Sequence, residues 1–138
     1  MGKFSYFILF FTSLFHLVTY SQKKTLNAVA SGEITIDGKF DEPIWEYAPV
    51  AKDFVMFYPD NGKPISDAKK TEVQVVYNDD AVYIAAKMYD DEPSKIRKEI
   101  TQRDVFGTAE HFGIFINGFN DSQQDFRFFV SAAGVQMD

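Results

Sequence analysis

Two pairs of alternating segments constrain the fold of this chain more than any other feature. Residues 71–77 place two valines and a tyrosine on one face of an expected strand, and residues 82–89 alternate in the same way. Asn78-Asp79-Asp80 lies between them and is typical of a tight turn, so this stretch predicts an antiparallel β-hairpin. Residues 111–116 and 126–130 make a second such pair.

These hairpins, with little helix and no crossover helices, predict an all-β fold, an antiparallel β-sandwich. The chain has 15 phenylalanines, and those on inward strand faces would supply its core. Further short strands are expected at Ile34–Ile36 and Phe54–Tyr58, with a loop at 59–64 and one helical turn within 94–100. Residues 128–138 contain a strand, a glycine turn and the start of another strand, so we expect a domain truncated on its C-terminal side.

The first 21 residues have the pattern of a secretory signal peptide. Lys3 gives a positive start, residues 4–18 are apolar and aromatic, and Ser21 is small enough for a cleavage site. The alternative, a membrane anchor, would need about 20 apolar residues, more than this run provides. Residues 22–31 are then a flexible lead or an edge strand, and residues 32–138 are one incomplete β-sandwich. We expect the protein to be periplasmic, outer-membrane-associated or extracellular.

The composition narrows the classes of partner. The chain contains no cysteine, and export without disulfides suits a bacterial β-domain. Its net charge of −6 argues against nucleic acid as a partner. An acidic chain of this kind is compatible with a neutral sugar or with calcium.

The most distinctive stretch is residues 34–45. Its first residues predict a half-buried strand, and Asp37-Gly38 predicts a turn because glycine accepts a positive φ angle. Asp41 is then expected to cap a short helix that carries Trp45, the only tryptophan of the chain. Strand, turn, capped helix and Trp45 together would make a compact corner.

The spacing Asp37-Gly38-x-x-Asp41-Glu42-x-x-Trp45 resembles the opening motif of family 9 carbohydrate-binding modules. Three later stretches resemble the same family in the same order, and the similarity runs from about Gly32 to the last residue. These stretches are the paired strands within residues 71–84, the carboxylates after Tyr89, and the segment from Glu110 to Asn117.

The resemblance implies a β-sandwich that binds polysaccharide or oligosaccharide without catalysis, often with structural calcium. It also implies a place at the front of a longer exported protein, followed by further domains such as a glycosidase or an outer-membrane barrel. The modules of this family hold the sugar between two aromatic rings on separate loops.

Four aromatic residues are candidates for such a ring platform, because the C–H face of a pyranose stacks on a flat apolar surface. They are Trp45, Tyr58, Tyr89 and Phe106. Packing in the corner is the alternative for Trp45. Arg97 and Arg103 are candidates for hydrogen bonds to sugar hydroxyls, and a solvated charged loop is the alternative for both.

Carboxylates gather at the expected turns, where they could bind calcium, since calcium takes six to eight oxygen ligands. Asp90, Asp91 and Asp104 are the main candidates, and simple turn formation is the alternative for each. No EF-hand spacing is present.

An enzymatic function has little support in the residues. A glycosidase needs two carboxylates roughly 5 to 10 Å apart, and nothing in the sequence defines such a pair. Glu110-His111 are adjacent on an expected strand, so their side chains point to opposite faces. Glycan binding is therefore the favoured function. A structural or interaction module without a sugar site is the first alternative, and a part of a hydrolase that acts on O-glycosyl bonds is the second.

Overall fold

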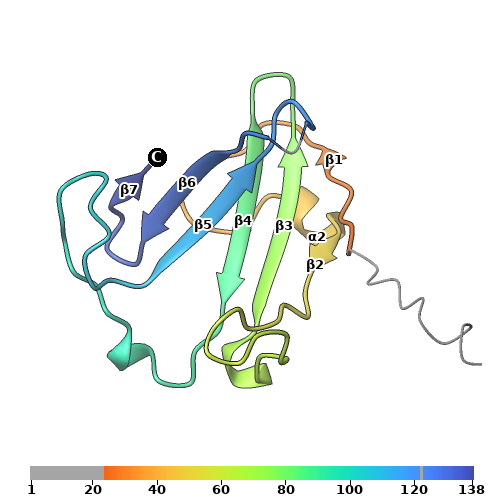
Figure 1. The fold of residues 1–138 in the computed structure, drawn as a ribbon. Helices are drawn as coiled ribbons and strands as arrows, with labels where there is room; N and C mark the ends of the chain where they lie inside the picture. The colour runs from red at the N-terminus through yellow and green to blue at the C-terminus, as the bar shows by residue number, and fades with distance from the viewer. Residues whose placement is uncertain (1–23, 122) are drawn as a thin grey trace, which may run out of the picture. The chain divides into compact units, whose positions relative to one another are not determined.

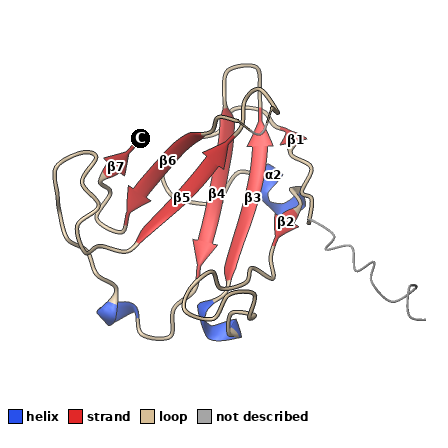
Figure 2. Ribbon diagram, in the orientation of Figure 1, coloured by secondary structure: helices blue, strands red, loops and turns tan. Residues whose placement is uncertain are grey.

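The computed structural model describes residues 24–121 and 123–138, and these form two mainly antiparallel β-sheets with little helix (Figure 2). The expected all-β class is thus confirmed. The helical segments are short: α2 (Ile44–Tyr47), η2 (Asp67–Lys69) and η3 (Pro93–Lys95). The expected signal peptide lies outside the described residues. Within them, no helix has the length and apolar character needed to cross a membrane.

The chain divides into two compact units. The first contains residues 72–86 and the described residues up to Lys52, and the second contains residues 53–71 and 87–138.

The sheet of the first unit is built around the expected hairpin of β3 (Thr71–Tyr77) and β4 (Val82–Met88), which run in opposite directions (Figure 1). Its turn forms because the side-chain oxygen of Asn78 accepts the backbone N–H groups of Asp80 and Ala81, at 3.0 and 2.9 Å. This hairpin is confirmed.

Two short strands complete that sheet along β3. β1 (Val29–Ala30) pairs with β3 in parallel, and β2 (Val50–Ala51) pairs with it antiparallel. Part of the segment expected to be a flexible lead or an edge strand is therefore an edge strand.

The core of the first unit lies between α2 and β3. Val76 is fully buried there, with Trp45 and Ala48 packed beside it. Gln74, on the same face of β3, is also buried, and its amide donates to the carbonyl oxygens of Trp45 and Ala48 at 2.8 and 2.9 Å. The short helix is thus fastened to the strand by apolar packing and by two buried hydrogen bonds.

The sheet of the second unit contains the other expected hairpin, β5 (His111–Ile116) and β6 (Phe126–Ser131), followed by β7 (Gln136–Met137). The β5–β6 register pairs Gly113 with Phe129 and Phe115 with Arg127. Residues directly opposite in an antiparallel pair share a face, so these four lie on one side of the sheet. The strand, glycine turn and further strand expected after residue 128 are present.

Two expected strands are absent from the described structure. Ile34–Ile36 is irregular and Ile36 is 89% exposed, because the Thr35 N–H donates to a side chain, not to a neighbouring strand. Residues 54–58 make a single bridge, between Val55 and Pro64, since the Met56 N–H and carbonyl bond within the adjoining loop. Both strand predictions were wrong, whereas the loop at 59–64 is confirmed.

Candidate functional site

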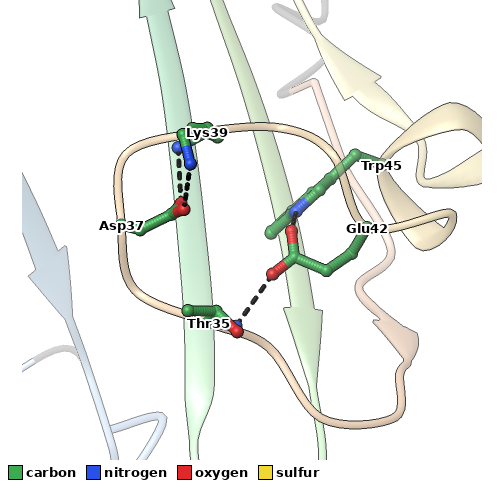
Figure 3. A network of polar contacts seen from close by, with 5 residues as sticks. All are labelled: Thr35, Asp37, Lys39, Glu42 and Trp45. Atoms are coloured by element: carbon green, nitrogen blue, oxygen red, sulfur yellow. Dashed lines mark hydrogen bonds and ion pairs between the residues drawn. The ribbon is translucent and has the colours of Figure 1, made fainter.

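The corner at residues 34–45 is held together by the carboxylate of Glu42 (Figure 3). One oxygen accepts the Thr35 N–H at 2.8 Å, and the other accepts the indole N–H of Trp45 at 2.8 Å. Asp41 does not cap the helix as expected: α2 begins after Pro43 and has no side-chain cap. The Glu42 carboxylate instead bonds to the preceding loop and so links the two ends of the corner.

Two acidic side chains of this corner, Asp37 and Glu42, are stabilised in their charged forms. The Thr35 N–H, followed by the Glu42 backbone and the Trp45 indole, lowers the pKa of Glu42. The side chain and then the backbone N–H of Lys39 lower the pKa of Asp37. The Asp37-Gly38 turn is confirmed, with Gly38 at a φ of 79° and the Lys39 N–H donated to Asp37 at 2.9 Å.

Trp45 is only 8% exposed, and the ring of Phe40 lies 5.9 Å from it, tilted by 57°. A hollow of about 310 Å³ adjoins both rings and is otherwise lined by the corner loop and by residues 82–86 of β4. The lining is mainly apolar, and the indole N–H is already bonded to Glu42. This geometry favours packing in the corner over a ring platform as the role of Trp45.

The other predicted ring platforms are dispersed over the second unit. Tyr58 is 84% exposed on its loop. Tyr89 is half-buried, with the ammonium groups of Lys70 and Lys87 at 4.8 and 5.3 Å from its ring centre. Phe106 packs edge-on against His111 and Phe129, with ring centres 5.0 and 5.1 Å apart. Of these platforms, Phe106 alone belongs to a larger aromatic cluster.

The two predicted arginines have different surroundings. Arg103 donates to Asp138 at 2.5 Å and to the Gln136 side chain at 3.2 Å, so it ties its loop to β7. Arg97 is exposed, and its carbonyl oxygen accepts the Glu110 N–H at 3.1 Å. The structure does not bring the two side chains together.

The three predicted calcium ligands do not converge either. The Lys69 ammonium lies 3.6 Å from Asp90 and 3.4 Å from Asp91, and these two carboxylates raise the pKa of Lys69. Asp104 accepts the Asp138 N–H at 3.0 Å. Among the described residues, no group of three or more carboxylate or histidine side chains could hold a metal ion.

One face of β5 and β6 carries an arrangement that the sequence reasoning missed. Four aromatic side chains follow one another there with ring centres 5.0 to 6.0 Å apart. We call this set, Phe106, His111, Phe129 and Phe115, the aromatic row. The row is continuous because Gly113 leaves room for the Phe129 ring, whose carbons would lie 2.3 Å from a β-carbon at that position.

The aromatic row ends at a hollow of about 400 Å³ whose other lining groups are polar. We call it the polar hollow, and its lining residues are Phe115, Asn117, Gln123, Gln124, Asp125 and Arg127. Phe115 is 58% exposed. Arg127 is oriented by Asp125, which lies 3.2 Å from its Nε atom, and its guanidinium lies 5.4 Å from the Phe115 ring centre.

The chemistry of the polar hollow suits a neutral polyhydroxylated ligand. Three side-chain amides can both donate and accept hydrogen bonds, and among the described residues those of Gln123 and Gln124 make none. The one carboxylate and the one guanidinium that line the hollow compensate each other's charge. Its volume lies within the range of roughly 300 to 1,000 Å³ typical of ligand pockets.

The alternation of β5 already placed His111, Gly113 and Phe115 on one face. The alternation alone does not specify the strand register that brings Phe129 and Arg127 onto that face.

Compared with known proteins, the chain matches no family model, no curated protein and no solved structure.

Proposed function

We propose that this chain is a non-catalytic carbohydrate-binding module of an exported protein, and that it binds a neutral glycan at the polar hollow. The observation that carries the proposal is the exposed ring of Phe115 beside three amides, a carboxylate and a guanidinium. In this proposal the two sheets belong to an antiparallel β-sandwich of the family 9 carbohydrate-binding type.

The aromatic ring and the polar side chains of the polar hollow match the apolar face and the hydroxyls of a sugar. The C–H face of a pyranose is apolar and slightly positive, so it packs on the negative face of an aromatic ring. Its hydroxyls need directional donors and acceptors, which Asn117, Gln123 and Gln124 provide. Beyond Phe115, the aromatic row offers further rings along which a longer chain of sugar units can lie.

The charges favour a neutral glycan over an acidic one. The chain carries a net charge of −6, which repels polyanions. Within the polar hollow, Arg127 is already paired with Asp125 and is not a free cation.

The lining of the polar hollow supports binding over glycoside hydrolysis. Glycoside hydrolysis needs two carboxyl groups at a defined separation, and Asp125 is the one carboxylate that lines this hollow. In the longer protein that we envisage, the module would hold an attached glycosidase or an outer-membrane barrel near its polysaccharide.

The proposal is tested by isothermal titration of the purified chain with neutral oligosaccharides of increasing length and with an acidic oligosaccharide. We expect saturable binding of a neutral series that strengthens with length, and weaker binding of the acidic one. A cooperatively folded protein that binds none of them would contradict the proposal.

A structural module without a sugar site is the second candidate, and one observation favours it. Trp45, the aromatic residue of the motif that suggested sugar binding, is buried, and its indole N–H is bonded within the corner. If no saccharide binds, this is the function that the geometry supports next.

A further inference from the structure

The chain contains two Asn-Gly pairs, Asn61-Gly62 and Asn117-Gly118. The hydrogen bonds around the two pairs differ. Both asparagines are exposed and both lie in loops, so water reaches each of them. Asn-Gly is the sequence most prone to deamidation, because glycine has no side chain to hinder attack by its own backbone nitrogen on the preceding amide. Local geometry then decides which pair reacts.

The backbone N–H groups of Gly62 and Gly118 differ in their hydrogen bonding. Gly62 donates its N–H to the Met56 carbonyl at 2.9 Å, and this hydrogen bond must break before the nitrogen can attack the Asn61 side chain. Among the described residues, the Gly118 N–H makes no hydrogen bond. As far as the described residues show, the attacking nitrogen is therefore not hydrogen-bonded at the second pair, whereas it is at the first.

The side chain of Asn117 is also the better electrophile. Its Oδ1 accepts the Phe119 N–H at 3.2 Å, which folds the amide back along the peptide that contains the Gly118 nitrogen. The same hydrogen bond draws electron density from Cγ. No hydrogen bond of this kind forms at the side chain of Asn61 within the described residues.

We propose that Asn117 is a site of spontaneous deamidation and that Asn61 is protected by its hydrogen-bonded glycine. The Gly118 nitrogen attacks Cγ of Asn117, the new C–N bond forms, and the Cγ–Nδ2 bond breaks. The proton of the Gly118 nitrogen passes through solvent to the leaving group, which departs as ammonia. Water then opens the cyclic imide at either carbonyl and leaves aspartate or isoaspartate at position 117.

The reaction changes the polar hollow. It replaces an amide that can donate by a carboxylate that only accepts, and it places a second negative charge beside Asp125. If the proposed glycan binding holds, deamidated protein binds the glycan more weakly. This last consequence rests on the proposed function, whereas the modification itself does not.

The test is incubation of the full chain at mildly alkaline pH, followed by peptide mapping with mass spectrometry and enzymatic labelling of isoaspartate. We expect the peptide with Asn117 to gain the mass of the amide-to-acid exchange several times faster than the peptide with Asn61. In concentrated urea, where the Gly62 hydrogen bond is lost, we expect the two rates to converge.

Gly118→Ala is the matched variant, because its β-carbon would meet nothing closer than Phe126 at 3.8 Å and Gly118 does not have a positive φ. We expect it to fold normally and to slow the reaction at Asn117 alone. Equal rates at the two sites in the native protein, or faster reaction at Asn61, would overturn the proposal.

Discussion

Phe115 and Arg127 face each other across the β5–β6 pair, with the guanidinium carbon 5.4 Å from the centre of the ring. The cation lies over the aromatic face, where it is attracted by the negative charge of the π system. Asp125 also holds the guanidinium, with its carboxylate 3.2 Å from the Nε atom. A flat apolar surface and a charged donor are thereby held side by side, which is the combination that a sugar site uses.

Replacement of Arg127 by methionine should weaken glycan binding while preserving the fold. A hydrogen bond from a charged donor contributes about 1.5 to 3 kcal/mol, so we expect the dissociation constant to rise roughly 10-fold or more. Calorimetric titration measures this directly. Arg103→Met is the control. It removes a guanidinium that is hydrogen-bonded to Gln136 and Asp138, and it should leave the affinity unchanged. An unaltered affinity in Arg127→Met would show that Arg127 does not contribute to glycan binding.

The single tryptophan provides a second prediction. Trp45 is buried and its indole N–H is held by Glu42, so a sugar at the polar hollow should leave its fluorescence maximum unchanged. Saccharide titration followed by fluorescence checks this. A shift of the maximum at saturation would show that Trp45 contacts the ligand, as the sequence motif suggested.

Gln74 supports the core of the first unit, so its replacement should cost stability. In Gln74→Met the carbonyl oxygens of Trp45 and Ala48 lose their shared donor, and each unsatisfied buried group costs about 1 to 3 kcal/mol. Denaturant unfolding measures the loss. Gln102→Met, at an exposed side chain, should change the free energy of unfolding by no more than about 0.5 kcal/mol. A similar small change in Gln74→Met would mean that its two hydrogen bonds are dispensable.

The Glu42 carboxylate predicts a pH dependence of stability. Its pKa is lowered in the folded chain, chiefly by the Thr35 N–H, so the folded state binds its proton less readily than the unfolded state. The stabilisation is present above the unfolded pKa and is lost as the pH falls through the folded pKa. Thermal melts from neutral to acidic pH should therefore show a falling Tm. In Glu42→Gln this part of the decline should disappear, and an identical pH profile in both proteins would count against the role of Glu42.

Some of the fold was accessible from the sequence because its determinants are local. The hairpins at 71–88 and 111–131 combine alternation with turn residues such as Asn78, and both formed as expected. The strand expected at Ile34–Ile36 failed because alternation does not show whether a neighbouring strand is available. Thr35 gives its N–H to a carboxylate seven residues away, which no local pattern indicates.

The candidate site was less accessible than the fold. Phe106 was expected as a ring platform in or next to a loop. Its aromatic partners come from β5 and β6, and Phe129 reaches the row only in the observed register. The length of the connection after Ile116 does not specify that register. The lining of the polar hollow likewise includes Asn117, which precedes that connection, and Arg127, which follows it. The pairing of the two strands therefore had to be known before these residues could be placed together.

The most direct test of the central claim compares two phenylalanine variants by calorimetric titration with a neutral oligosaccharide. Phe115→Ala removes the ring of the polar hollow, and Phe57→Ala removes a more exposed ring of the same kind that does not line it. We predict that Phe115→Ala lowers the affinity by about 1 to 3 kcal/mol, by analogy with the loss of a ring that stacks on a nucleic-acid base. We predict that Phe57→Ala binds like the unmodified chain. Equal affinities for all three proteins, each shown to be folded, would contradict the assignment of glycan binding to this site.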